Sequence, residues 1–262
     1  MISITSAQLD AWLAGFIFPI ARILGLTAIA PVFNSVGVPR RIRLIVGLMI
    51  GLALAPALPP MPPVPAGSWI GLAILAQQLM IGLLLGLTLR IAFFAVDITG
   101  SLIGLQMGLS FAIFYDPQNG AQTSVLSEFL LLVATLLFLA MNGHLLTLSV
   151  LAESFRLLPV TTSPTLAEAG FTTVLSWAAI LFSMGLLLSL PVIAALLIAN
   201  LAMGVLSRVA PQLNLFAIGF PVTIVCGFAV LMISLPYFGA AMQRLFDHAF
   251  AAMRTVMQVA GQ

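Results

Sequence analysis

The chain is a succession of long apolar runs separated by short polar or proline-rich breaks. Runs of about 18 or more apolar residues indicate transmembrane helices. Backbone N–H groups in lipid must be paired within the segment, so each spanning piece should be helical, and unbroken runs exclude the alternating strands of a membrane barrel. The sequence therefore predicts an all-α, multi-pass integral membrane protein, with seven apolar segments: Trp12–Phe33, Ile42–Leu58, Trp69–Val96, Ile98–Phe114, Val125–Leu151, Phe171–Leu206 and Gln212–Phe238.

The breaks between these segments are clear. Asn34 to Pro39 leads into three arginines, Arg40, Arg41 and Arg43. Six prolines between Pro56 and Pro65 cannot continue a helix and predict a stiff, extended loop. Asp116 to Gly120 has the composition of a turn. Arg156 to Gly170 is the longest polar connection.

The segment lengths are uneven. Phe171–Leu206 would be about 54 Å long as one straight helix, against a bilayer core of about 30 Å. We expect either two helices broken near Pro191 or one helix that projects beyond the membrane. Ile42–Leu58 and Ile98–Phe114 are at the short limit for a crossing. Such irregularity is typical of broken or re-entrant helices and hairpins buried among partners.

Composition agrees with the membrane prediction and narrows the function. The chain is 62% hydrophobic and 6% charged, whereas soluble domains are about 25% charged. All nine basic residues are Arg, and the net charge of +2 cannot neutralise a run of phosphates, which excludes nucleic-acid binding. The single cysteine, Cys226, forms neither an internal disulfide nor a metal site by itself.

Charge distribution gives an orientation. Arg40 to Arg43 form the most positive loop, which the positive-inside rule places in the cytoplasm. Seven crossings would then place the N-terminus outside and the C-terminal tail inside. Because Met1 to Ala11 contains no Arg or Lys, we interpret the first segment as retained rather than as a cleaved signal peptide.

The sequence contains no pattern of an enzyme. It has no HExxH, no GxSxG and no P-loop, and His144 and His248 have no neighbouring cysteine. Asp97 and Asp116 form the only pair of aspartates adjacent to the membrane region, and neither stands in a supporting motif. We therefore predict no catalytic residues, no cofactor and no metal.

Four charges interrupt the apolar segments, and each costs at least about 2.5 kcal/mol at the centre of a bilayer. Such charges mark either a transport path or a buried ion pair or subunit contact. Because the four form no repeating proton-relay pattern, we favour the structural interpretation. They are Arg22, Arg90, Asp97 and Glu128.

Glycines spaced four apart form a second signal. This spacing lets membrane helices approach closely, although it does not identify the partner. The candidate packing positions are Gly82, Gly86, Gly100, Gly104 and Gly108.

The stretch from Leu105 to Gly120 contains Met, Phe and Tyr side chains before a sharp turn. One interpretation is an ordinary helix end with interfacial aromatics. The other is a hydrophobic constriction, since soft apolar side chains can close a pore by excluding water. The residues alone leave both open.

Three stretches make the chain resemble the FliR family of type III export gates. They are Leu105–Ala112 with Asp116-Pro117-Gln118 and Ser127-Glu128-Phe129, then Val209–Pro221, and the first loop from Ala30 to Arg43. The second stretch is the most specific, through Pro211, Gln212, Asn214, Gly219 and Pro221. The resemblance covers essentially the whole sequence.

The resemblance implies a non-enzymatic subunit of the flagellar basal body in the bacterial inner membrane. Such subunits complete a closed channel with about five copies of FliP and about four of FliQ, beside FlhB and FlhA, and the channel passes unfolded flagellar proteins. The fold would join a FliP-like part, residues 1–165, to a FliQ-like hairpin, residues 166–262. The family's pore plug would fall on Gln106, Met107, Leu109, Phe111, Ile113, Phe114, Tyr115, Asp116 and Pro117.

Two alternatives stay open at this stage. The homologous subunit of a virulence injectisome has a similar sequence, although Pro211–Asn214 favours the flagellar form. A small-solute permease, from a different class, predicts an inverted repeat with matched polar residues at the midplane, and no such repeat is visible.

Overall fold

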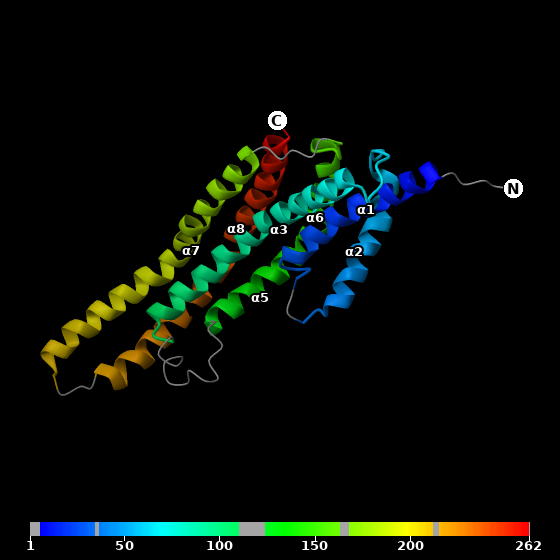
Figure 1. Cartoon of the computed structure of the whole chain (residues 1–262). Coiled ribbons are helices and arrows are strands. Elements are labelled where there is room, and N and C mark those ends of the chain that lie inside the picture. Colours follow the sequence, from blue (N-terminus) through cyan, green and yellow to red (C-terminus); the bar gives the residue numbers. More distant parts are fainter. Residues whose placement is uncertain (1–5, 35–36, 110–123, 163–167, 212–214, 262) are drawn as a thin grey trace. The chain divides into compact units, whose positions relative to one another are not determined.

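The structure is a computed structural model, and it describes residues 6–34, 37–109, 124–162, 168–211 and 215–261. These residues contain no strand, which confirms the predicted all-α fold. The helices shown in Figure 1 are α1 (Ser6–Ile29), α2 (Arg40–Leu54), the short 3-10 turn η1 (Ala55–Ala57), α3 (Trp69–Gln106), α5 (Val125–Ala140), α6 (Gly143–Leu157), α7 (Glu168–Val209) and α8 (Leu215–Ala260).

The prediction of seven crossings is wrong for the part of the chain that the structure describes. Four helices, α1, α3, α7 and α8, are long and apolar enough to cross a membrane. The count rises to five if the pair α5 and α6 forms one broken span. The result is a multi-pass membrane protein, but the orientation deduced from seven crossings no longer follows.

Two predicted segments are one helix. α3 runs without a break through Asp97, which had separated Trp69–Val96 from Ile98–Phe114. Aspartate has a low helix propensity but retains its backbone N–H, so one such residue does not end a helix of 38 residues. The helix expected to reach Phe114 instead ends at Gln106.

One predicted segment is two helices. Val125–Leu151 is interrupted after Ala140. Asn142 adopts a left-handed conformation with φ of 56° and precedes Gly143, the first residue of α6. Asparagine tolerates this conformation better than other residues with a Cβ, which explains a break within an apolar run.

The last two helices are longer than their apolar segments. α7 continues through Pro191 as one helix, so the break expected there as one of the two alternatives is absent. α8 continues past Phe238 to Ala260. Its last part stays helical because one side of it is buried, through Leu245, Phe246, Ala249, Met253 and Val256.

The chain folds into two compact units that interleave along the sequence. Unit 1 comprises residues 1–91, 142–178 and 246–262, and unit 2 comprises residues 92–141 and 179–245. Three helices, α3, α7 and α8, contribute to both units. Each unit is described separately below.

Candidate functional site

Arg22 is the most distinctive polar residue of unit 1. It lies on α1 and is completely buried. Its Nε donates to Oε1 of Gln78 at 2.8 Å, and Nη1 donates to Oγ of Ser154 at 3.0 Å. Nη2 donates to the carbonyl oxygen of Leu158 at 2.8 Å. The guanidinium carbon lies 4.0 Å from the centre of the Phe155 ring.

The Arg22 site joins three helices through neutral groups. Gln78 comes from α3, and Ser154 and Phe155 come from α6. A buried charge is tolerated when its donors are paired, and an aromatic face adds a cation–π contribution of about 2 kcal/mol when desolvated. The expected alternatives were an ion pair or a subunit contact. The described partners are instead uncharged residues of the same chain.

Glycines bring α1 and α3 close enough for this arrangement. A Cβ at Gly82 would meet the backbone of Arg22 and Leu26, and one at Gly86 would meet the carbonyl oxygen of Leu26. From the other side, a Cβ at Gly25 would meet the backbone of α3. The two predicted glycines therefore lie where helix backbones touch, directly beside the Arg22 site.

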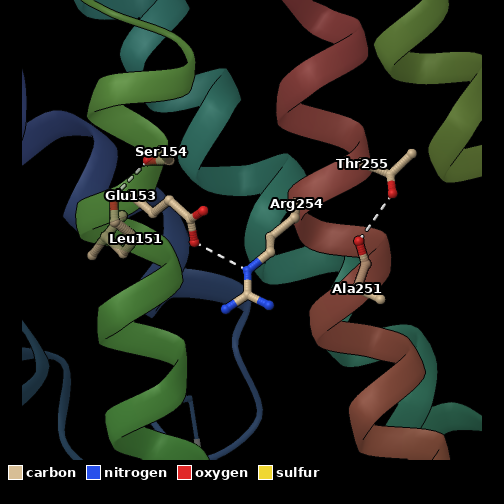
Figure 2. A network of polar contacts seen from close by, with 6 residues as sticks. All are labelled: Leu151, Glu153, Ser154, Ala251, Arg254 and Thr255. Carbon is tan, nitrogen blue, oxygen red and sulfur yellow. Dashed lines mark hydrogen bonds and ion pairs between the residues drawn. The ribbon is translucent and has the colours of Figure 1, made fainter.

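A second polar contact of unit 1 lies at its surface. Glu153 of α6 and Arg254 of α8 form an ion pair in which Oε2 and Nε are 3.0 Å apart (Figure 2). Both side chains are close to half exposed, so the pair contributes little to stability, typically below about 1 kcal/mol. Ser154 is the next residue along α6, but it belongs to the Arg22 site.

In unit 2, α3 ends in a tight cap that Gly108 makes possible. The N–H of Leu109 donates to the carbonyl oxygen of Gly104 at 3.0 Å, and the N–H of Gly108 donates to that of Leu105 at 3.1 Å. These two bonds form a Schellman motif, and φ of 81° at Gly108 is the conformation that favours glycine. Gly108 therefore ends the helix, whereas it was expected on the helix packing face.

The side chain of Met107 anchors this helix end within unit 2. It is completely buried and packs with Ile103 and Leu126. Its atoms occupy the space that a Cβ at Gly227 of α8 would need. The hydroxyl of Thr223 donates to the carbonyl oxygen of Met107 at 3.2 Å. The first apolar residue of the predicted plug is thus held in the core of the unit.

Most of the predicted plug lies outside the described residues. Gln106 and Leu109 are partly buried at the end of α3. The remaining members fall in the undescribed segment 110–123, and these are Phe111, Ile113, Phe114, Tyr115, Asp116 and Pro117.

An apolar groove opens beside the end of α3. It has a volume of about 290 Å³ and is lined by apolar residues of α5 and α8 together with Leu109. Phe129 and Phe228 are its aromatic walls. The segment 110–123 begins next to Leu109 and ends just before Val125, another lining residue.

The two remaining glycines predicted to pack, Gly100 and Gly104, lie against the start of α5. In unit 2, a Cβ at Gly100 would meet Ser127, and one at Gly104 would meet Ser124. The hydroxyl of Ser127 also donates to the backbone carbonyl of Asp97 at 2.9 Å.

Unlike Arg22, the other three predicted charges are not fully buried. Arg90 and Asp97 are partly exposed, and Glu128 is exposed in the first turn of α5. The four charges therefore do not share one environment.

The residues of the second family motif surround the connection between α7 and α8. Pro211 follows α7, while Gln212 and Asn214 are outside the described residues. Gly219 and Pro221 lie within the first two turns of α8. Among the described residues, a Cβ at Gly219 would meet nothing within 4 Å.

Sequence reasoning missed several residues that complete these sites. Gln78 and Ser154 hold Arg22, and Thr223 and Gly227 hold Met107. Gln77-Gln78 is a polar pair within an apolar run, which is a usable signal for a buried partner. Ser154 and Thr223 carried no such signal, because single hydroxyls in membrane helices commonly bond to their own backbone.

The described residues contain no group of three His, Cys, Asp or Glu side chains able to hold a metal ion.

Comparison with known proteins places these features in a family. Residues 13–249 match the model of the bacterial export proteins, family 1. The chain is 40% identical to the flagellar biosynthetic protein FliR of Pectobacterium carotovorum subsp. carotovorum and 39% identical to that of Escherichia coli strain K12, with 98% of each chain covered. It is 32% identical to FliR of Bacillus subtilis strain 168, covering 71% of this chain and 72% of the relative.

Proposed function

Since this chain belongs to the FliR family of bacterial export proteins, we propose that it is a non-enzymatic subunit of the flagellar protein export gate in the inner membrane. In this proposal it completes, with FliP and FliQ and beside FlhB and FlhA, a closed channel for unfolded flagellar proteins. The observation that carries the proposal is the match to FliR relatives along nearly the whole chain.

The exposed surface of unit 2 supports a role as a subunit. α7 presents Ile198, Leu201 and Val205 with about 66–71% of each residue exposed. α8 presents Met232 and Ile233 with over 70% exposed. Such surfaces must be covered by lipid or by other membrane helices, because large exposed apolar patches mark interaction sites.

The plug belongs to the proposal as well. A channel wide enough for an unfolded chain would also leak ions when idle, and each charge that crosses 100 mV releases about 2.3 kcal/mol. The seal must exclude water yet yield to an arriving polypeptide. We assign this role to Phe111, Ile113, Phe114 and Tyr115, with the buried Met107 as the fixed point from which the segment departs.

The proposed division separates a FliP-like part, residues 1–165, from a FliQ-like hairpin, residues 166–262. It places α7 and α8 together as the hairpin. Both helices contribute to each compact unit, so the hairpin would fold jointly with the first part rather than as an independent domain.

The direct test is export in a flagellated cell that lacks its own copy of this subunit. Expression of the chain should restore secretion of flagellar proteins to the medium, measured by immunoblot, and should restore swimming. Secretion that continues undiminished in the cell without the subunit would contradict the proposal. Restoration by a chain whose membrane helices are deleted would also contradict it.

A further inference from the structure

Helix α2 is too short to span a membrane, yet its surface is apolar. Its 15 residues extend about 22 Å, against about 30 Å for the hydrocarbon core. Its only buried residues are Gly47 and Gly51. The apolar side chains that are 37–62% exposed are Ile42, Leu44, Ile45, Val46, Leu48, Met49 and Leu52.

The register of α2 against α1 places its N-terminus at one end of a candidate span. A Cβ at Gly47 would meet the side chain of Leu24, and one at Gly51 would meet that of Ile20. Four residues forward on α2 correspond to four residues back on α1, so the two helices are antiparallel. Extending this register puts Arg40–Arg43 level with the C-terminal end of α1, where the candidate span of that helix ends.

Among the described residues, no acidic side chain pairs with the three arginines at this point. Arg40 and Arg41 are exposed, and Nε of Arg43 is buried without a hydrogen-bond partner among the described residues. The first turn of α2 has no acid, although the helix dipole there is positive. The sequence has no Asp or Glu between Asp10 and Asp97. The balancing anion is therefore expected from outside this part of the chain.

We propose that α2 is an interfacial helix whose three arginines bind the phosphates of anionic phospholipids. Apolar side chains along the helix with cations at one end form the pattern of a segment seated at the membrane boundary. Arginine stems can lie along apolar surface while the guanidinium reaches the headgroups. In this arrangement α2 does not cross the bilayer, and its exposed face contacts acyl chains.

Lipid selectivity tests the proposal directly. The full chain, co-expressed with its partner subunits, is reconstituted in vesicles of equal parts phosphatidylcholine and phosphatidylglycerol, and the lipids retained after extraction are counted by native mass spectrometry. Phosphatidylglycerol should be enriched, and each arginine removed should lower that enrichment about fivefold. The test variant is Arg40→Gln/Arg41→Gln/Arg43→Gln. The matched control, Arg156→Gln/Arg208→Gln/Arg244→Gln, removes the same charge elsewhere and should retain the enrichment.

Equal losses in both triple variants would show nonspecific charge attraction and overturn the proposal. So would an absence of enrichment in the unchanged protein, or its loss when inorganic phosphate is added at constant ionic strength. If the test triple variant does not assemble, Arg41→Gln alone provides the measurement, because Arg41 is exposed at the surface.

A spin label distinguishes lipid from a protein partner on the apolar face. Met49→Cys, which replaces a residue that is 62% exposed, is labelled in a Cys226→Ala background within the assembled complex. Contact with acyl chains predicts strong relaxation by oxygen and weak relaxation by a water-soluble nickel chelate. Protection from both would mean that another subunit covers α2, which contradicts the proposal.

Discussion

At the scale of single residues, the chain satisfies its buried charge with neutral groups from distant segments. Ser154 and Leu158 are 132 and 136 residues from Arg22. The sequence showed that Arg22 needed a partner, because a charge in an apolar segment is costly. It could not identify the partners, since their proximity depends on how three helices pack. The same limit applies to Gly227, whose role appears only through the Met107 side chain beside it.

Removing the charge of Arg22 should destabilise the chain by leaving buried acceptors unpaired. Arg22→Met keeps much of the side-chain volume but removes all three hydrogen bonds, and we expect a loss of about 2–4 kcal/mol in the free energy of unfolding. Arg22→Met/Gln78→Leu should recover part of this loss, because it also removes one acceptor. Thermal unfolding in detergent measures both variants. Unchanged stability in Arg22→Met would show that the site contributes nothing.

The close contact between α1 and α3 predicts that alanine destabilises the chain at Gly82 but not at Gly204, which lies outside this contact. Gly82→Ala should separate the helices, since its Cβ would meet the backbone of Arg22. Backbone cannot move aside as a flexible side chain can, so overpacking of about 1–3 kcal/mol is expected. Gly204→Ala on α7 has open space around it and should be neutral or slightly stabilising. Equal melting temperatures for the two variants would contradict the close contact.

At the scale of elements, hydrophobic patterning predicted which segments are helical but not where helices continue or stop. A single Asp97 left α3 intact, whereas Asn142 with a left-handed backbone divided α5 from α6. Pro191, Pro221 and Pro236 all lie inside helices. Membrane helices tolerate proline because neighbouring groups can satisfy the freed carbonyls. Local residue preferences therefore predicted a break at Asp97 that is absent and missed the break at Asn142.

The way α3 ends leads to a prediction about a deletion in the proposed plug. Deleting Ser110 to Tyr115 leaves the Gly108 cap and the buried Met107 in place, so the complex should still assemble. The membrane should then leak ions or small dyes, and Phe111→Ser should leak less. Dye uptake in cells, alongside complex yield, is the measurement. A deletion complex that assembles normally in tight membranes would place the seal in another subunit.

At the scale of the whole molecule, the long helices differ in how much of their apolar surface is buried within this chain. Each compact unit has a core of its own, while α7 and α8 bury only about 24% and 17% of their apolar windows within this chain. α3 buries 67% of its window. Because the Arg22 site is satisfied internally, the need for partner subunits arises mainly from the two last helices.

The central claim, that this chain is one subunit of an export gate, is tested most directly by native mass spectrometry of the chain co-expressed with its FliP and FliQ homologues. We predict a particle with a single copy of this chain, about five copies of FliP and about four of FliQ. The chain expressed alone should be heterogeneous, because α7 and α8 would remain largely uncovered. A monodisperse, well-folded monomer that forms no complex with either homologue would contradict the account.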